Sequence, residues 1–261
     1  MLEKQVIYEI QGMEEVTKKS VVYDSDNGVS LTMDLYYPPK LPDNSQLPAI
    51  IFVFGFPNSV MLDRFGVKLK DSGQYVSWGQ LAAASGIVGI TYETTQPEKD
   101  IYSVLAYVRH NAKTLQIDGN RFGMWACSGN VPTALSVLVT APTYVKCSVL
   151  YYGLMFEGSD SHEMEELAKR YGSAYPCKTE SVDHLSQDIP LFVVRTGEDH
   201  PQLNKSIERF VCEATKRNLP LTFVNYGQGQ HGFDLENDSV SSQEIIKHTL
   251  AFLHEHLFKP M

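Results

Sequence analysis

The sequence predicts an α/β fold: a mostly parallel central sheet with an antiparallel N-terminal hairpin and helices on both faces. Two observations support this prediction. Short apolar runs alternate with segments of helical periodicity along most of the 261 residues. The first two strand-like runs instead flank an Asn-Gly pair, which is a strong signal for a hairpin. Because no linker, repeat or low-complexity tract interrupts this order, we interpret residues 1–261 as a single domain.

The predicted elements follow in chain order. Residues 20–23 and 29–36 form the hairpin, which ends at Pro38 and Pro39 because proline cannot donate a ladder hydrogen bond. Residues 153–189 are the least regular part and form a candidate lid. Helical patterns lie at residues 75–84, 100–114, 132–139 and 162–171. Apolar runs typical of strands buried on both faces lie at residues 50–54, 87–92, 122–126, 147–152, 191–196 and 221–225.

The acidic composition argues against two classes of partner. The chain carries 22 Lys and Arg against 31 Asp and Glu, for a formal net charge of −9, and no basic cluster that could neutralise a run of phosphates. We therefore expect no nucleic acid and no anionic membrane as partner. The N-terminal residues are acidic where a secretory signal needs basic ones, and no apolar stretch approaches the ~18 residues of a spanning helix. The expected location is cytoplasmic.

The four cysteines indicate neither a disulfide framework nor a metal site. Cys127, Cys147, Cys177 and Cys212 share no CxxC spacing. No group of carboxylates and histidines has metal-ligand spacing either. We therefore expect no metal and no cofactor.

The stretch MWACSGN places two candidate nucleophiles side by side between a predicted strand and a predicted helix. A nucleophile on such a tight turn needs small residues two positions before and after it, because those side chains crowd the strand and the helix. Around Ser128 these positions hold Ala126 and Asn130, and asparagine tolerates unusual backbone angles better than most residues. Around Cys127 the first position holds the indole of Trp125. Ser128 is therefore the candidate nucleophile, with Cys127 as the alternative.

Two further candidates follow Ser128 in chain order. Asp199 comes just after a predicted strand, and His231 lies in a glycine-containing loop after the last predicted strand. The carboxyl ends of parallel strands meet at one edge of a sheet, so we expect the three side chains to lie together. Glu198 and Asp234 compete with Asp199 as the acid.

These residue types suit nucleophilic catalysis at a carbonyl group. A serine hydroxyl becomes nucleophilic when an imidazole accepts its proton, and a carboxylate fixes the tautomer of that imidazole. Backbone N–H groups must then receive the negative charge that develops on the carbonyl oxygen. Gly129, at the helix start, and Phe56, in the loop after residues 50–54, are the expected donors, because Pro57 has no N–H.

Five segments together resemble the dienelactone-hydrolase-like and esterase/lipase-like branch of the α/β-hydrolase family. The resemblance implies an α/β-hydrolase fold, a Ser128–Asp199–His231 triad and an oxyanion hole of backbone N–H groups. The segments cover nearly the whole chain: TMDLYYPP (32–39), IIFVFGF (50–56), YVRHNAKTLQIDGNRFGMWACSGN (107–130), PLFVVRTGEDH (190–200) and HGFDLEND (231–238).

Three departures from the family pattern bear on activity. Ala126 and Asn130 replace the two glycines of the usual G-x-S-x-G turn, and Phe54 stands where many members have a histidine. Dienelactone hydrolases themselves use cysteine at the turn, which keeps Cys127 open as the nucleophile. The departures also leave open the hypothesis that the protein is catalytically silent and retains the fold to bind a ligand.

The leading hypothesis is a serine hydrolase that cleaves a carboxylic ester of a small or medium acyl group. A thioesterase or small-peptide hydrolase with the same triad is the alternative, because the chain resembles prolyl-oligopeptidase catalytic domains in its TMDLYYPP and HGF segments. The sequence leaves open whether the protein forms a homodimer. We expect the small-molecule ester to contact Tyr92, Leu154, Met155 and Phe156.

Overall fold

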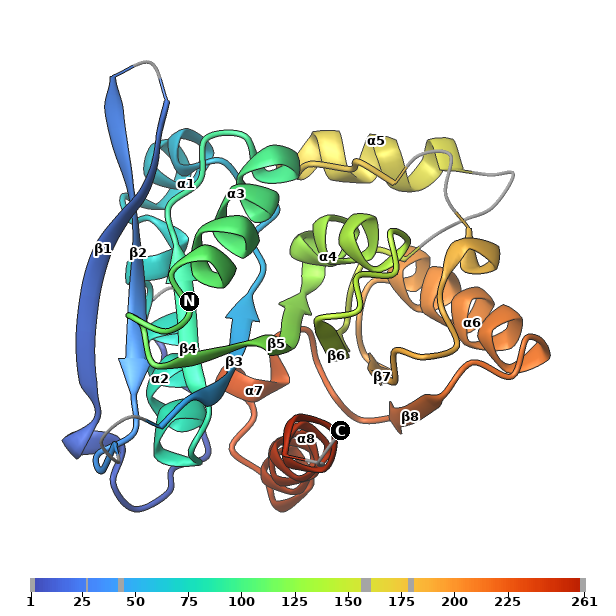
Figure 1. Ribbon diagram of the computed structural model, residues 1–261. Helices are drawn as coiled ribbons and strands as arrows, with labels where there is room; N and C mark the ends of the chain where they lie inside the picture. Colours follow the sequence, from blue (N-terminus) through green and yellow to red (C-terminus); the bar gives the residue numbers. More distant parts are fainter. Residues whose placement is uncertain (1–2, 27, 42–44, 156–160, 178–180, 259–261) are drawn as a thin grey trace.

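One eight-stranded sheet organises the chain in the computed structural model (Figure 1). The structure describes residues 3–26, 28–41, 45–155, 161–177 and 181–258. The strands are β1 (Thr17–Asp26), β2 (Val29–Tyr37), β3 (Leu47–Phe52), β4 (Val88–Tyr92), β5 (Ile117–Cys127), β6 (Val145–Tyr151), β7 (Leu191–Thr196) and β8 (Leu221–Tyr226).

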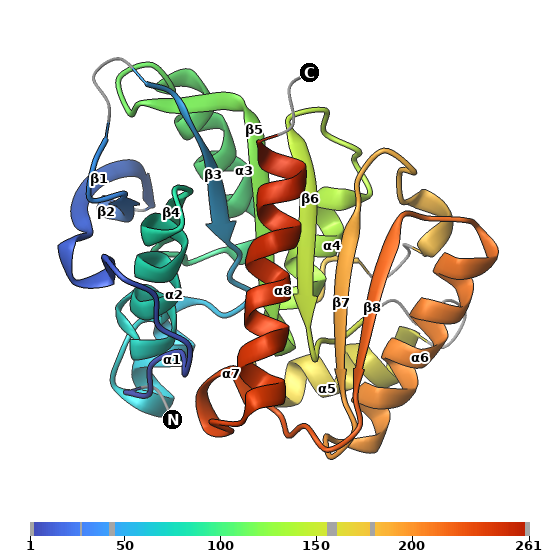
Figure 2. The same cartoon turned by 90° about the horizontal axis from the view of Figure 1, so that it is seen from below.

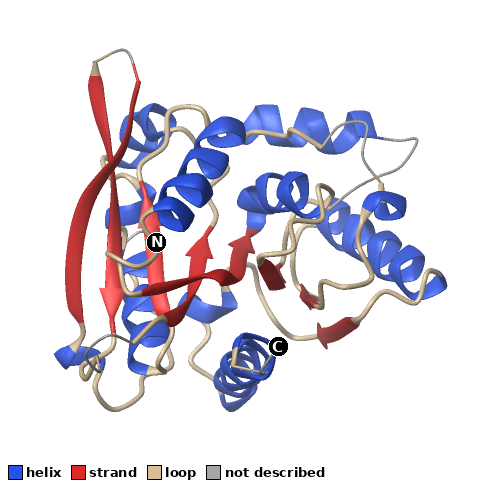
Figure 3. Cartoon of the chain, in the orientation of Figure 1, coloured by secondary structure: helices blue, strands red, loops and turns tan. Residues whose placement is uncertain are grey.

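The strand order confirms the predicted architecture. Across the sheet the strands run β1-β2-β4-β3-β5-β6-β7-β8. β2 pairs antiparallel with both β1 and β4, whereas each neighbouring pair from β4–β3 to β7–β8 is parallel. The sheet therefore combines a parallel body with an antiparallel N-terminal hairpin (Figure 3).

Helices cover both faces of the sheet. α2 and α8 pack on one face, with α8 lying along β5 and β6, and α3 and α4 pack on the other (Figure 2). In the described part of the chain no helix is long and apolar enough to cross a bilayer. The helices are α1 (Asn58–Phe65), α2 (Gly73–Ala84), α3 (Pro97–His110), α4 (Val131–Leu138), α5 (Ser161–Tyr171), α6 (Pro201–Lys216), α7 (Phe233–Glu236) and α8 (Val240–Leu257).

α1 and β5 are two of the elements that differ from the sequence prediction. α1 occupies a segment whose flanking glycines and prolines predict only a loop, and it ends at Gly66, whose φ of 71° terminates a helix without strain. β5 begins five residues before the run predicted at 122–126. Residues 118–121 are Asp-Gly-Asn-Arg and are at least partly exposed, so they lack the continuous apolar pattern that predicts a buried strand.

An aromatic cluster beneath the carboxyl end of β5 holds that strand in place. The Trp125 ring lies 5.1 Å from Trp78, 5.6 Å from Phe52 and 5.4 Å from Tyr151, measured between ring centroids. All four side chains are buried, and each such pair adds about 0.5–1.5 kcal/mol beyond the burial of its area. Since Trp125 lies three residues before Ser128, this packing fixes where the strand ends and the next turn begins.

Candidate active site

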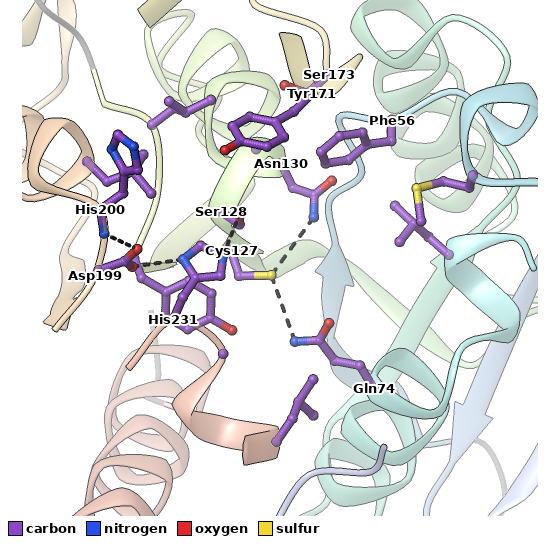
Figure 4. Close-up of a pocket in the computed structure, with 18 of the residues that line it drawn as sticks. Phe56, Gln74, Cys127, Ser128, Asn130, Tyr171, Ser173, Asp199, His200 and His231 are labelled. Atoms are coloured by element: carbon purple, nitrogen blue, oxygen red, sulfur yellow. Dashed lines mark hydrogen bonds and ion pairs between the residues drawn. The ribbon is translucent and has the colours of Figure 1, made fainter. Parts of the chain in front are cut away.

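The structure brings Ser128, Asp199 and His231 together at the carboxyl edge of the parallel sheet (Figure 4). Ser128 follows the last residue of β5, Asp199 follows β7 by three residues, and His231 lies in the loop after β8. The three residues are far apart in the sequence, and the parallel direction of their strands places them at one edge.

Two hydrogen bonds join these side chains into a chain. The His231 Nε2 atom lies 2.9 Å from the Ser128 Oγ atom, and the His231 Nδ1 atom lies 2.8 Å from Asp199 Oδ2. The imidazole is 38% exposed, whereas the Asp199 side chain is only 4% exposed. The imidazole therefore connects a partly accessible hydroxyl to a shielded carboxylate.

Ser128 stands on a strained turn. Its φ is +54°, in the left-handed region that few non-glycine residues adopt, and it begins the short 3-10 helix Ser128–Asn130 that leads into α4. Such a backbone costs about 1–3 kcal/mol and is typical of a nucleophile elbow. Asn130 has an ordinary φ of −86°, so the expectation that its tolerance of unusual backbone angles suits this position is wrong. The unusual backbone belongs to the serine itself.

Asp199 is held by its own strand end as well as by His231. Its carboxylate accepts hydrogen bonds from the Thr196 hydroxyl at 2.9 Å and from the His200 backbone N–H at 2.6 Å. Burial raises the pKa of Asp199, but the hydrogen bond and charge of His231 and these two donors outweigh burial and lower the pKa below its usual value. Asp199 is therefore an ionised acceptor at neutral pH.

The two competing carboxylates lie elsewhere. Glu198 is exposed, and its side chain accepts a hydrogen bond from Gln230 at 3.4 Å. Asp234 is fully buried and accepts from Trp78 Nε1 at 2.8 Å and from Gln74 Nε2 at 3.1 Å. Its carboxylate is thus occupied by donors other than His231.

Asp234 belongs to a set of side chains that we call the buried polar cluster, formed by Gln74, Tyr75, Cys127, Asn130, Tyr152 and Asp234. The Tyr152 hydroxyl donates to Asp234, and the Tyr152 ring lies 4.7 Å from the His231 ring. Burial raises the pKa of Asp234 despite these donors. Sequence reasoning missed this cluster because its members come from distant segments; Gln74, for example, lies 160 residues before Asp234.

Cys127 points its thiol into this cluster (Figure 4). The sulfur lies 3.4 Å from the Tyr75 hydroxyl and 3.9 Å from the amide nitrogens of Gln74 and Asn130. Burial, with a smaller contribution from the Asp234 charge, raises the pKa of the thiol to about 12. The alternative nucleophile is therefore a protonated thiol at neutral pH.

A cavity of about 370 Å³ opens in front of Ser128. Phe65 and Tyr171, which are 57% and 49% exposed, extend its wall toward solvent. Residues of the candidate lid segment contribute to the wall through Leu154, Leu167, Tyr171 and Ser173. The remaining apolar lining comes from Phe56, Met61, Leu69, Leu203 and Leu235.

Two of the four expected substrate contacts do not line this cavity. Tyr92 is fully buried, stacks on Phe54 and accepts a hydrogen bond from the Phe54 backbone N–H at 3.0 Å, so it supports the loop after β3 from beneath. Met155 is also fully buried, and its backbone N–H donates to the Ser206 hydroxyl at 3.4 Å. Leu154 does line the cavity, and Phe156 lies outside the described residues.

The two expected oxyanion donors both lie at the cavity. Phe56 and Gly129 are in contact: a Cβ atom added at Gly129 would lie 2.7 Å from the Phe56 ring, which explains the glycine at this position. In the part of the chain that the structure describes, neither backbone N–H donates to a protein acceptor outside regular secondary structure. Within the same residues, no group of three or more His, Cys, Asp and Glu side chains could hold a metal ion.

Comparison with known proteins identifies the fold. No protein-family model and no curated protein matches the chain. The apo form of esterase 2 from Thermogutta terrifontis matches with a TM-score of 0.73 and 17% identity, over 97% of this chain and 98% of that chain. Its propionate-bound form matches with a TM-score of 0.71 and 17% identity, over 95% of this chain and 98% of that chain. The form phosphonylated by sarin matches with a TM-score of 0.72 and 16% identity, over 93% of this chain and 96% of that chain.

The chain has the α/β-hydrolase fold. In the α/β-hydrolase fold the nucleophile, the acid and the histidine follow one another in that order along the chain. Ser128, Asp199 and His231 have this order, and each follows a strand of the parallel body. The fold thus explains why three separate loops meet at one point.

Proposed function

We propose that the protein is a serine hydrolase that cleaves carboxylic esters of small or medium acyl groups. The observation that supports this most strongly is the Ser128–His231–Asp199 hydrogen-bond chain at an apolar cavity. The fold adds support, because the Thermogutta esterase of this fold has been obtained with propionate and with butyrate bound and phosphorylated by paraoxon.

In the first half of the proposed reaction, Ser128 Oγ attacks the ester carbonyl carbon while His231 Nε2 takes the hydroxyl proton. Asp199 accepts from Nδ1–H, which fixes the tautomer with Nε2 free and stabilises the imidazolium that forms. The electron pair of the carbonyl moves onto its oxygen, where the Phe56 and Gly129 N–H groups receive the charge. His231 then gives its proton to the departing alcohol, and an acyl-Ser128 ester remains.

In the second half, water replaces the alcohol. His231 takes a proton from the water as it attacks the acyl carbon, a second tetrahedral oxyanion occupies the same two N–H groups, and the proton returns to Ser128 as the acid leaves. The partial exposure of the His231 side chain supports this step, because water must reach the imidazole. The same three side chains therefore serve both steps.

The expected acyl size follows from the cavity. A volume of about 370 Å³ lies near the lower end of the ~300–1,000 Å³ range of ligand pockets, and its lining is largely apolar. We therefore expect turnover of p-nitrophenyl esters from acetate to about octanoate, with longer chains turned over more slowly. Matching thioesters and small peptide amides, measured in parallel, test the alternative substrates.

This experiment needs the wild type and Ser128→Ala side by side. Ester hydrolysis by the wild type that disappears in the variant supports the proposal. Equal rates in both proteins, or no hydrolysis of any ester by the folded wild type, would overturn it.

A further inference from the structure

The backbone after β3 is fixed by one hydrogen bond per residue. The Val53 N–H donates to a carbonyl of β5 at 2.8 Å, and the Phe54 N–H donates to the Tyr92 hydroxyl at 3.0 Å. The Gly55 N–H donates to the Asn130 side-chain oxygen at 2.7 Å. Phe56 comes next, and its N–H is the first of the series that the described protein leaves for a substrate oxygen.

Gly55 packs directly against the turn formed by Ser128–Asn130, which we call the elbow. A Cβ atom at this position would lie 2.5 Å from the Gly129 carbonyl oxygen, so a side chain would force the loop and the elbow apart. The Gly55 carbonyl accepts from the Ala174 N–H at 2.6 Å. Gly55 is therefore held at both of its backbone polar atoms. Ala174 bonds its carbonyl, in the peptide group that carries the Phe56 N–H, and the Asn130 side chain bonds its N–H, in the peptide group before it.

Asn130 uses both ends of its amide. While Oδ1 accepts from Gly55, the Nδ2 group donates to the Tyr75 hydroxyl at 2.8 Å, and the side chain is almost fully buried. A carboxamide offers a donor and an acceptor on one short side chain, so the Tyr75 contact orients the oxygen toward Gly55. The glycine that usually stands here would supply neither group.

We propose that Asn130 is a positioning residue for the oxyanion hole: it ties the Gly55 peptide to the elbow and so fixes where the Phe56 N–H lies relative to Ser128. The inference rests on the proposed function, because it requires an oxyanion beside Ser128. In this role Asn130, which replaces a glycine of the G-x-S-x-G pattern, is part of the site.

Removal of the Asn130 amide is expected to act on the transition state rather than on substrate binding. Loss of one oxyanion donor lowers kcat by roughly 10²–10³-fold, and displacement of such a donor should give part of that loss. We expect Asn130→Ala and Asn130→Gly to lower kcat about 10–100-fold while KM changes less than about threefold.

Asn58→Ala is the matched control. Asn58 is the first residue of α1, two residues after Phe56, and its side-chain oxygen also accepts a backbone hydrogen bond, from Thr94 N–H at 3.3 Å. If general loosening of the loop were responsible, both variants would lose activity alike. We expect kcat of Asn58→Ala to stay within about twofold of the wild type.

Inhibition by an alkyl trifluoromethyl ketone separates positioning from a merely structural role. Ser128 Oγ adds to the ketone carbon, its proton moves to His231, and the carbonyl electron pair becomes an alkoxide in the oxyanion hole. The inhibition constant should therefore rise in the Asn130 variants by the same factor as kcat/KM falls. An unchanged inhibition constant, or a kcat within twofold of wild type in a folded variant, would overturn the proposal.

One further measurement and one further variant distinguish the possible outcomes. Amide hydrogen exchange at Gly55 should accelerate in the Asn130 variants, whether or not any substrate is turned over. If the alanine and glycine variants fail to fold, Asn130→Ser serves instead, because its hydroxyl is polar but too short to make both contacts. An inactive wild type would defeat the proposed function and this role together, whereas an active wild type with equally active variants defeats this role alone.

Discussion

Ser128 and Cys127 are adjacent in the chain and both line the cavity, but their reactive atoms have different surroundings. The Ser128 hydroxyl meets an imidazole at 2.9 Å, at the wall of an open cavity. The Cys127 thiol lies in the buried polar cluster, where its contacts are the Tyr75 hydroxyl and two amide groups. Each region also holds a carboxylate, Asp199 in the first and Asp234 in the second.

The difference between the regions lies in what surrounds each nucleophilic atom. Thiols are intrinsically better nucleophiles than hydroxyls, but only as thiolates, and burial raises the pKa of Cys127 to about 12. Ser128 Oγ lies within hydrogen-bond distance of an imidazole, the base of the proposed mechanism, whereas Asp234 is occupied by buried donors. The reactivity of a nucleophilic side chain therefore depends more on an accessible base beside it than on its residue type.

The largest expected effect contrasts the two nucleophilic atoms directly. Ser128→Ala and His231→Ala should each lower kcat for a p-nitrophenyl ester by roughly 10⁴-fold or more, since members of such a unit fail together. Cys127→Ala should stay within about fivefold of the wild type. Steady-state kinetics measure all three, and a larger loss in Cys127→Ala than in Ser128→Ala would reverse the assignment.

The next effect concerns the acid. Asp199→Asn should lower kcat by roughly 10³–10⁴-fold, because an asparagine in this place favours the wrong tautomer of His231. Glu198→Gln removes a neighbouring carboxylate that is exposed and bonded to Gln230, so its kcat should change less than about threefold. Equal losses in the two variants would contradict the role of Asp199.

The sequence predicts the parts of this site that depend on strand ends. A buried apolar run followed by a small polar loop locates Ser128, Asp199 and His231, because parallel strands share a carboxyl edge. The apolar-run pattern also predicts the sheet, and the Asn-Gly pair predicts its hairpin. α1 escapes prediction because it is eight residues long and carries exposed apolar side chains at Leu62 and Phe65.

The contacts of side chains between distant segments could not be predicted in the same way. Asn130 contacts Gly55 and Tyr75, which lie 75 and 55 residues away in the sequence, and no local sequence pattern predicts either contact. Tyr92 was expected at the substrate by its position at a strand end, but its ring faces the interior and packs on Phe54. Which face of the strand a last residue occupies depends on packing rather than on its place in the sequence.

The two carboxylates should change the free energy of unfolding with pH in opposite directions. The raised pKa of Asp234 gives a contribution that is present below the ordinary value of 3.8 and is lost as pH rises through the raised value. The lowered pKa of Asp199 gives a contribution that is present above 3.8 and is lost as pH falls through the lowered value. A pKa difference of one unit corresponds to about 1.4 kcal/mol.

Urea unfolding of the wild type, Asp234→Asn and Asp199→Asn from pH 3 to pH 7 measures this contrast. As pH rises, the stability of the wild type relative to Asp234→Asn should fall, and its stability relative to Asp199→Asn should rise. Two differences that change in the same direction would show that the carboxylates do not occupy contrasting environments.

The last prediction concerns a rate of chemical labelling. A thiol with a pKa of about 12 is thiolate in roughly one part in 10⁴ at pH 8, so iodoacetamide should modify Cys127 far more slowly than the exposed Cys212. Peptide mapping by mass spectrometry after timed labelling measures both rates, with urea-unfolded protein as the reference. Fast modification of Cys127 in the folded protein would contradict its burial.

Reaction with a fluorophosphonate probe tests the central claim most directly, because this probe requires an activated nucleophile and no particular substrate. We expect the adduct on the peptide that contains residues 127 and 128, unchanged in Cys127→Ala and absent in Ser128→Ala. A folded wild type that does not react, or an adduct that survives in Ser128→Ala and disappears in Cys127→Ala, would contradict the assignment of Ser128 as the nucleophile.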